Sequence, residues 1–395
     1  MSENKSYVDT AVVLAGGVGS RLFPLTKAKP KPLVPVANYT MLEWNLFVLK
    51  SAGIKNIIVV VKYLGDQIRD YIENVLKDRF PSMKFSVPDV DPKDTADALR
   101  QVAHLIPDDC PRFFVTMADI ITNINLREMA EFHGSKPGVA TISLKSIEQP
   151  RSFGVIVLDG NSEILLFLEK PHPQELYMVT MMFQRRKSIQ FHANLVNTGM
   201  YLFEREILDI LNNYHDLMDF GKHVFPFLQE RKLGLFGYSP SAYNPYYWMD
   251  CGTPEKLLWG NWDALRRWCW PYLPRGEERD GSWYGKDIHW GKSINIEPPV
   301  SIGDNVKFED NVQVKHWSVI GDECKIGKDT IIRAAFLDKN VKIGSNCVID
   351  RCLLAENVII GNNVTIHEKA VIAKGISIPD DSDISSYKHI ETNPF

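Results

Sequence analysis

The chain has 395 residues, which is more than one average domain and predicts two or three. Its 45 Lys and Arg residues and 49 Asp and Glu residues give a formal net charge of −4. With 45% hydrophobic and 24% charged residues, this composition excludes a largely disordered chain. The charge balance also excludes the strongly basic surface that nucleic-acid binding needs, so we expect no nucleic-acid partner.

The N-terminus carries no signal for export or membrane insertion. It is polar, and the next apolar run, residues 11–15, is too short for a signal peptide or a membrane span. We therefore expect a cytoplasmic protein with no membrane partner. The six cysteines are scattered without a CxxC pair, which argues against a disulfide framework or a zinc site.

The first 260 residues alternate between β-branched runs and segments with helical spacing of apolar residues. Runs typical of strands buried on both faces are at 11–15, 57–61, 113–117 and 140–144, and helical patterns are at 41–51 and 67–77. This alternation predicts an α/β domain with a mostly parallel sheet covered by helices. In such sheets, ligands bind where the strands end, so the loops that leave the strands are the expected site.

A six-residue repeat begins near residue 292. Aliphatic or aromatic residues recur every six positions from Ile302 to Ile332, and after two five-residue slips the period continues to Ile372. This period, with Gly, Asn and Asp nearby, predicts a parallel β-helix of about four coils, each about 18 residues long. We expect four parts: a domain at 1–260, a Trp-rich connector at 261–291, the β-helix at 292–375 and a tail at 376–395.

Large aromatic residues gather between the two predicted domains. We interpret them as a packing core between domains or between subunits, in preference to a ligand-binding platform. The tryptophans are Trp259, Trp262, Trp268, Trp270, Trp283 and Trp290.

The most informative stretch follows the first predicted strand. Gly16, Gly17 and Gly19 leave room for backbone N–H groups to face an anion, and Arg21 and Lys31 supply cations that suit phosphate. The spacing matches neither the dinucleotide-binding GxGxxG fingerprint nor the P-loop. The pattern therefore predicts a phosphate site of another kind.

The whole stretch at 14–36, LAGGVGSRLFPLTKAKPKPLVPV, resembles the signature of the sugar-1-phosphate nucleotidylyltransferases. Segments that look like further family motifs follow, namely TADA at 95–98, MADI at 117–120, SFGV at 152–155, EKP at 169–171, NTG at 197–199 and WMDCGTP at 248–254. The resemblance implies a Rossmann-like catalytic domain followed by a left-handed β-helix. It also implies transfer of a nucleotidyl group from a nucleoside triphosphate to a hexose 1-phosphate, with release of pyrophosphate.

The resemblance assigns roles to individual residues. It implies catalytic roles for Arg21, Lys31, Asp119 and Asp250, the two aspartates binding Mg²⁺. It implies nucleotide binding by Leu14, Ala15, Gly16, Gly17, Gly19, Arg21, Lys31 and Thr95. It implies sugar-phosphate binding by Gly154, Glu169, Lys170, Asn197 and Thr198. The residues agree with this chemistry, because Asp119 and Asp250 each end an apolar run and supply the hard oxygen ligands that Mg²⁺ prefers.

Two positions depart from the family pattern, and several alternatives stay open. Asp94 and Ala118 stand where the family usually has Gly, and we hypothesise that Asp94 alters the choice of base or weakens nucleotide binding. The motifs favour mannose-1-phosphate guanylyltransferases or glucose-1-phosphate nucleotidylyltransferases without deciding base or sugar. A catalytically weak regulatory subunit is one alternative, and acyltransferase activity at His316 or His367 of the β-helix is another. We expect a homo-oligomer, from dimer to tetramer, or a subunit of a related hetero-oligomer.

Overall fold

The computed structural model describes residues 8–147, 155–168, 172, 174–175, 177–178, 181, 189–190, 195–240 and 246–392. The chain divides into two compact units, and each unit is made of three separate segments of the sequence. The first comprises Met1–Gly16, Leu46–Ala118 and Ile124–Trp248, and the second comprises Gly17–Asn45, Asp119–Asn123 and Met249–Phe395. The segments that carry Arg21, Lys31 and Asp119 therefore belong to the same unit as the C-terminal part of the chain.

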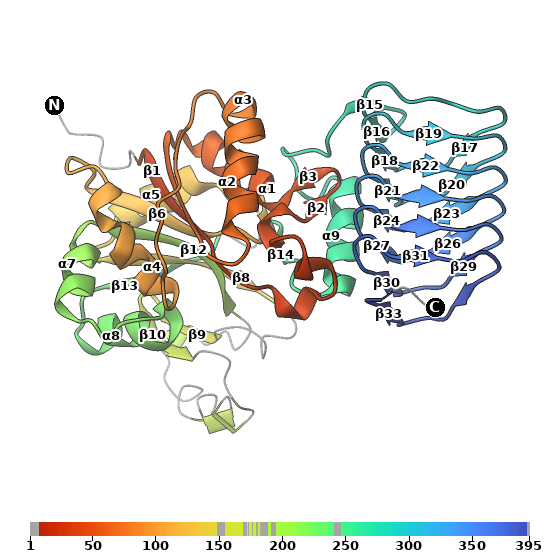
Figure 1. Ribbon diagram of the computed structural model, residues 1–395. Helices are drawn as coiled ribbons and strands as arrows, with labels where there is room; N and C mark the ends of the chain where they lie inside the picture. The colour runs from red at the N-terminus through yellow and green to blue at the C-terminus, as the bar shows by residue number, and fades with distance from the viewer. Residues whose placement is uncertain are drawn as a thin grey trace. The chain divides into compact units, whose positions relative to one another are not determined.

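The first unit is built on a ten-stranded mixed sheet with the main order β10-β9-β12-β6-β1-β4-β5 (Figure 1). Strand β1 pairs in parallel with β4 and β6, and β12 pairs antiparallel to β6 and β8. The strands are β1 (Thr10–Ala15), β4 (Asn56–Val61), β5 (Lys84–Ser86), β6 (Arg112–Met117), β8 (Ala140–Ser146), β9 (Val155–Asp159), β10 (Ile164–Leu168), β11 (Ile189–Gln190), β12 (Leu195–Glu204) and β13 (Leu235–Tyr238). The four predicted strands and the Rossmann-like sheet are confirmed, with parallel pairing limited to part of it.

Helices cover this sheet. Every residue of β1 is buried, as a continuous apolar run predicts for a strand covered on both faces. Alternate residues of β1, such as Val12 and Leu14, join one core with Leu99 and Val102 of α4. The helices are α1 (Met41–Ala52), α2 (Gly65–Tyr71), η4 (Ile72–Leu76), α3 (Lys77–Arg79), α4 (Thr95–Val102), η5 (Ala103–Leu105), α5 (Leu126–Gly134), α7 (Glu206–Asn213), η7 (Phe220–Val224) and α8 (Phe225–Glu230).

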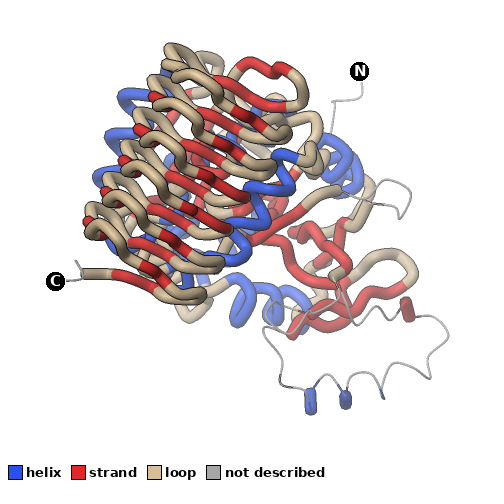
Figure 2. Tube along the Cα trace, turned by 90° about the vertical axis from the view of Figure 1, so that its right-hand side faces the viewer, coloured by secondary structure: helices blue, strands red, loops and turns tan. Residues whose placement is uncertain are grey.

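The second unit contains a parallel β-helix, whose short strands stack coil upon coil (Figure 2). Three sheets run along it. The first is formed by β16 (Ser282–Tyr284), β18 (Ser301–Ile302), β21 (Val319–Ile320), β24 (Phe336–Leu337), β27 (Leu353–Leu354), β30 (Val371–Ile372) and β33 (His389–Ile390), with β15 (Glu277–Arg279) antiparallel at its end. The second is formed by β17 (Asn295–Ile296), β20 (Gln313–Val314), β23 (Ile331–Arg333), β26 (Val348–Asp350), β29 (Thr365–Ile366) and β32 (Asp383–Ile384). The third is formed by β19 (Lys307–Phe308), β22 (Lys325–Ile326), β25 (Lys342–Ile343), β28 (Ile359–Ile360) and β31 (Ser377–Ile378).

Three positions of the six-residue repeat shape each side of a coil: the inward aliphatic residue, the residue at the corner between two sides, and the glycine after the aliphatic residue. The predicted aliphatic positions, Ile302 and Ile326 among them, are buried in one continuous core. The corner positions take positive φ, between 55° and 63° at six of the asparagines, a conformation that Asn tolerates better than most residues. The glycine after the aliphatic residue is needed for close approach of the next coil, because a Cβ at Gly327 would lie 2.5 Å from the backbone of Gly344.

The β-helix is longer than predicted at both ends. Strand β16, within the expected connector, pairs in parallel with β18 and so belongs to the first coil. Strands β31, β32 and β33 continue the repeat, with Ile378, Ile384 and Ile390 buried. The prediction of a tail from residue 376 is therefore wrong up to Ile390. Most residues of this stretch are polar, and only one residue on each side of a coil is apolar and buried, so the repeat was not recognised in the sequence.

The other elements of the second unit precede the β-helix in sequence. They are η1 (Ser20–Leu22), η2 (Leu25–Lys27), η3 (Lys31–Leu33), the antiparallel pair β2 (Pro35–Val36) and β3 (Tyr39–Thr40), the paired strands β7 (Ile120–Thr122) and β14 (Trp248–Asp250), and α9 (Pro254–Leu265). No helix among the described residues is long and apolar enough to cross a membrane.

The tryptophans of the expected connector form less of a core than predicted. Trp283 is buried, and Trp262 packs against Trp317 at a ring distance of 6.1 Å. Four others remain largely exposed in the single chain, namely Trp259, Trp268, Trp270 and Trp290. At 46–61% exposure these four rings are not packed into a core in the single chain, and a packing role between subunits stays a prediction.

Candidate active site

The glycine-rich turn begins where β1 ends and is held by backbone geometry. Leu14 and Ala15 are the last two residues of β1 and are buried. Gly19 has a φ of 66°, which favours glycine, and its carbonyl accepts a hydrogen bond of 2.8 Å from Thr26 Oγ1. A Cβ at Gly19 would also lie 3.1 Å from Lys31 Cβ. Glycine is therefore needed here for its backbone conformation and for the close approach of Lys31.

Three of the predicted site residues meet around one ammonium group. Lys31 Nζ lies 2.6 Å from Asp119 Oδ2 and 3.0 Å from Asp250 Oδ1, and Arg21 Nη2 lies 3.4 Å from Asp250 Oδ2. Asp119 occupies the turn between β6 and β7, and Asp250 ends β14, which pairs with β7. The pairing of β7 with β14 thus brings the two carboxylates together. Both aspartates belong to the second unit.

Burial and charge act against each other in this cluster. The Lys31 side chain is only 5% exposed, and burial alone would favour its neutral form. The carboxylates of Asp119 and Asp250 outweigh that effect, and the pKa of Lys31 is raised above its usual value. Burial likewise opposes ionisation of Asp250, but Lys31 and then Arg21 hold its pKa below the usual value. Lys31 and Asp250 are therefore both charged at neutral pH.

The residues after Asp250 are shaped to fit around it. A Cβ at Gly252 would lie 2.9 Å from both carboxylate oxygens of Asp250 and 3.0 Å from Arg21 Nη2. Helix α9 then begins with Pro254 as its first residue, and the side chain of Thr253 caps it by accepting a hydrogen bond from Lys256 N. In the sequence DCGTP, Asp250 supplies the carboxylate, and Gly252 leaves room for that carboxylate and for Arg21. Thr253 and Pro254 begin helix α9.

The two carboxylates suit a hard divalent cation. They are oxygen donors, Asp119 is 28% exposed, and its Oδ1 makes no hydrogen bond to the described residues. The described part of the chain holds no group of three or more His, Cys, Asp or Glu side chains placed for a metal ion. Mg²⁺ often binds through one or two carboxylates and completes its shell with water and substrate phosphates, so this donor set fits it.

Comparison with known proteins gives the family. The family model described as nucleotidyl transferase matches residues 10–267. This chain is a nucleotidyl transferase. A second model, the LbH domain of the EIF2B epsilon subunit, matches residues 279–384 and agrees with the predicted left-handed β-helix.

Individual relatives differ in how much they cover. The chain is 28% identical over 340 residues to a UTP–glucose-1-phosphate uridylyltransferase of Synechocystis sp., covering 82% of this chain and 81% of the relative. It is 30% identical over 251 residues to the mannose-1-phosphate guanyltransferases of Kluyveromyces lactis and Saccharomyces cerevisiae. The latter matches span 63% of this chain and 63% of each relative.

Other predicted residues of this nucleotidyl transferase lie in the first unit. Thr95 begins α4, where its Oγ1 donates to Asp219 Oδ2 at 3.0 Å and accepts from Phe220 N at 3.0 Å. Asp94 is the N-cap of α4, and its side chain accepts a hydrogen bond of 2.8 Å from Thr95 N. Asp94 therefore has a structural role that the comparison with family motifs did not suggest. A Cβ at Gly16 would lie 3.2 Å from Lys62 Cβ. Gly17 is the first residue of the second unit, and a Cβ there would meet nothing within 4 Å.

The predicted sugar-phosphate residues are only partly described. Gly154, Glu169 and Lys170 lie outside the described residues. The Asn197 side chain accepts a hydrogen bond of 2.9 Å from Gly199 N and donates one of 3.0 Å to Tyr201 Oη.

Thr198 makes hydrogen bonds within the protein. Its hydroxyl is buried and donates a hydrogen bond of 3.0 Å to the Ser143 carbonyl, and its own carbonyl accepts one of 2.9 Å from Trp248 Nε1. These hydrogen bonds hold the turn, and a sugar contact by Thr198 stays a prediction.

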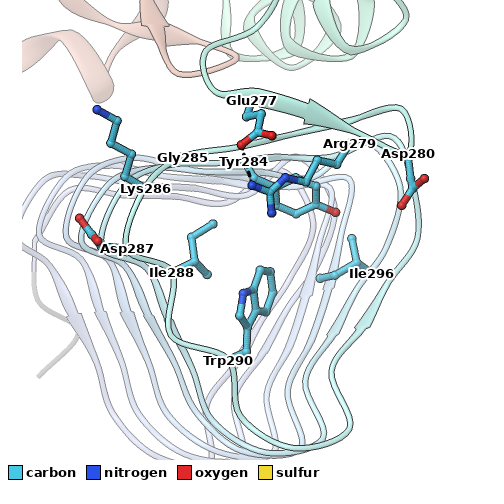
Figure 3. A pocket seen from close by; sticks show the side chains of 10 residues that line it. All are labelled: Glu277, Arg279, Asp280, Tyr284, Gly285, Lys286, Asp287, Ile288, Trp290 and Ile296. Atoms are coloured by element: carbon cyan, nitrogen blue, oxygen red, sulfur yellow. Dashed lines mark hydrogen bonds and ion pairs between the residues drawn. The ribbon is translucent and has the colours of Figure 1, made fainter.

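A separate hollow lies at the first coil of the β-helix. It has a volume of about 670 Å³, and Trp290, Tyr284 and Ile288 line it together with the Glu277–Arg279 ion pair (Figure 3). It shares no residue with the Lys31 cluster, so we assign it no part in the reaction. The two histidines considered for acyltransferase activity make contacts within the protein: His367 pairs with Asp383 at 2.9 Å, and His316 packs edge-on against Trp317.

Proposed function

We propose that this nucleotidyl transferase forms a nucleotide sugar and pyrophosphate from a nucleoside triphosphate and a hexose 1-phosphate. The observation that carries the proposal is the cluster in which Lys31 joins Asp119 and Asp250 beside Arg21. The cluster combines cations for phosphate oxygens with carboxylates that suit a divalent ion. The names of the relatives, which include a glucose-1-phosphate uridylyltransferase and mannose-1-phosphate guanyltransferases, support the same reaction type.

The proposed reaction needs no nucleophilic side chain. An oxygen of the sugar phosphate attacks the α-phosphorus, and the bond from that phosphorus to the bridging oxygen breaks. The electron pair of that bond leaves with pyrophosphate. Because both substrates are anions, positioning and charge stabilisation supply most of the catalysis. Arg21, whose side chain is 61% exposed, binds the triphosphate, and Lys31 stabilises the charge on the departing pyrophosphate.

Asp119 and Asp250 would hold a divalent ion, which we propose is Mg²⁺. When bound, such an ion supplies positive charge that neutralises phosphate oxygens. Lys31 contacts both carboxylates, so it holds them in place when no ion is bound. On the sugar side we propose that Lys170 binds the phosphate, Glu169 and Asn197 bind hydroxyl groups, and Gly154 allows close approach.

A substrate panel tests the proposal. Each of the four common nucleoside triphosphates is combined with glucose 1-phosphate, mannose 1-phosphate and a galactose 1-phosphate control, and pyrophosphate release is measured with Mg²⁺ or with a chelator. We expect release with one or a few pairs, lost on chelation and restored by added Mg²⁺. Absence of release from the folded protein with every pair would contradict the proposal and favour a regulatory subunit. Consumption of acetyl-coenzyme A with amino-sugar phosphates would instead favour the acyltransferase alternative.

A further inference from the structure

A second buried lysine lies two residues before Lys31 and contacts the β-helix. Lys29 Nζ is 2.5 Å from Asp338 Oδ2 and 3.3 Å from Glu356 Oε2, and its side chain is only 16% exposed. Asp338 follows β24, and Glu356 follows β27 in the next coil. Glu356 also pairs with Lys374 at 3.3 Å. The segment that carries Lys31 is thus tied to two coils of the β-helix by charged groups.

These ion pairs lie where there is little room for water. The cavity around Lys29, lined among others by Leu25, Val34 and Phe336, measures about 10 Å³, which is near the lower limit for one ordered water. Burying these charges has a free-energy cost, and apolar residues would fill the space at least as stably. Charged groups at such a place are therefore better explained by the fixed geometry that they impose than by stability.

Other contacts fasten the same segment at its ends. Asn38 Nδ2 donates to Ser301 Oγ at 2.8 Å and to the Ile320 carbonyl at 3.1 Å, and both acceptors belong to the β-helix. At the other end, Lys27 pairs with Glu391. Lys29 lies between Lys27 and Asn38, and of these three residues it is the nearest to Lys31 in the sequence. The segment therefore runs along the β-helix over several coils.

The backbone between the two lysines leaves little freedom. Pro30 separates them and fixes an extended backbone, with φ of −64° and ψ of 141°, before η3 begins at Lys31. A displacement of Lys29 toward or away from the β-helix would therefore be passed to Lys31 across one rigid residue. In a site where a displacement of about 1 Å costs about a hundredfold in rate, this coupling is significant.

We propose that Lys29 is a positioning residue, and that its ion pairs with Asp338 and Glu356 make the β-helix the scaffold that holds Lys31 in its catalytic position. This inference rests on the proposed function of Lys31. It gives the β-helix a part in the reaction that does not require a ligand site of its own. In this role Lys29 depends on the carboxylates of Asp338 and Glu356, which lie on consecutive coils.

The test separates positioning from stability. The variants are Lys29→Met, Asp338→Asn and the double variant Lys29→Met/Asp338→Asn. Lys29→Met leaves the buried Asp338 carboxylate without its cation, and Asp338→Asn leaves Lys29 with Glu356 alone. We therefore expect both single variants to lower Tm and kcat. The double variant removes both charges and leaves Glu356 paired with Lys374. We therefore expect its Tm to return to that of the wild type while kcat stays at least tenfold lower and KM for the sugar phosphate is unchanged.

A matched control and a second readout complete the design. Lys315→Met removes a lysine that pairs at 2.6 Å with Glu297 inside the β-helix, away from the segment, and should leave kcat unchanged. Amide hydrogen exchange of residues 20–33 should be faster in the double variant than in the wild type, with the β-helix equally protected. Recovery of kcat together with Tm in the double variant would overturn the proposal. If the wild type releases no pyrophosphate, the proposed function fails, and unchanged exchange at 20–33 would then overturn this inference separately.

Discussion

Replacing Asp250 by Asn tests the charge of the central cluster with little change in its shape. The carboxylate is 13% exposed and contacts Lys31 Nζ at 3.0 Å and Arg21 Nη2 at 3.4 Å. The amide is nearly the same size, and its oxygen still accepts a hydrogen bond, so only the negative charge and one acceptor oxygen are lost. The experiment therefore measures what the charge of Asp250 contributes.

The expected effect on stability is small. Lys31 keeps Asp119 at 2.6 Å, so its ammonium is not left without a partner. Breaking a buried ion pair completely costs about 3–5 kcal/mol, and we expect about 1–2 kcal/mol here because one partner remains and a buried charge is removed. The protein should stay folded, with a lower Tm.

The expected effect on turnover is large. Removal of one preorganised charge from an active site costs about 10²–10³ in kcat, or about 2.7–4 kcal/mol of transition-state stabilisation. The assay is pyrophosphate release at saturating substrates and Mg²⁺, with Tm measured on the same sample. Asp263→Asn is the matched control, because Asp263 is also buried in the second unit and pairs with Arg266 at 3.2 Å. The control should lose similar stability and keep its turnover, and turnover of Asp250→Asn within about threefold of the wild type would refute the reasoning.

Three further predictions concern neighbouring features. Gly252→Ala places a methyl group 2.9 Å from the Asp250 carboxylate and 3.0 Å from Arg21, so kcat for pyrophosphate release should fall at least tenfold; unchanged kcat would mean that the Arg21–Asp250 contact is dispensable. Burial opposes ionisation of Asp97, but hydrogen bonds from Lys93 N, Gln101 and Arg100 lower its pKa below 3.8. Its stabilising effect is therefore present above about pH 4 and lost as the pH falls through the lowered pKa, so the Tm difference between the wild type and Asp97→Asn should shrink at low pH; a constant difference would contradict this. Asp94→Gly should cost only a few tenths of a kcal/mol, because Gly is also tolerated at an N-cap, yet change the preference among the four nucleoside triphosphates; identical profiles would reject our hypothesis for Asp94.

The sequence predicted the features that depend on local repetition. Val12 and Leu14 belong to a short apolar run typical of a strand buried on both faces, and the structure confirms that strand. The six-residue period was recognised through its two five-residue slips, which appear as coils of 17 residues in which Val319 pairs with Phe336 and Phe336 with Leu353. Around Ile384 the outward residues are polar. One apolar inward residue on each side of a coil was not enough there to reveal the repeat.

Contacts between distant segments were harder to predict. Lys29 in KAKPKP looks like one of several solvated lysines, and nothing near it in sequence indicates carboxylates more than 300 residues away. Nothing in the sequence indicated that the Thr198 hydroxyl donates a hydrogen bond to the Ser143 carbonyl. The meeting of Asp119 and Asp250 followed from resemblance and from strand ends, but the position of Lys31 between them required the structure.

The division of the chain into units changes how the β-helix is understood. A β-helix that only extended the chain would not need buried charges on its flank, since its own core already stabilises each coil. The second unit nevertheless includes 17–45 and 119–123, which carry Arg21, Lys31 and Asp119. Covalent order assigns these residues to the N-terminal domain, whereas contacts assign them to the unit that contains the β-helix. A variant that alters the coils at Asp338 should therefore affect the reaction more than one that alters an equally buried position remote from this segment.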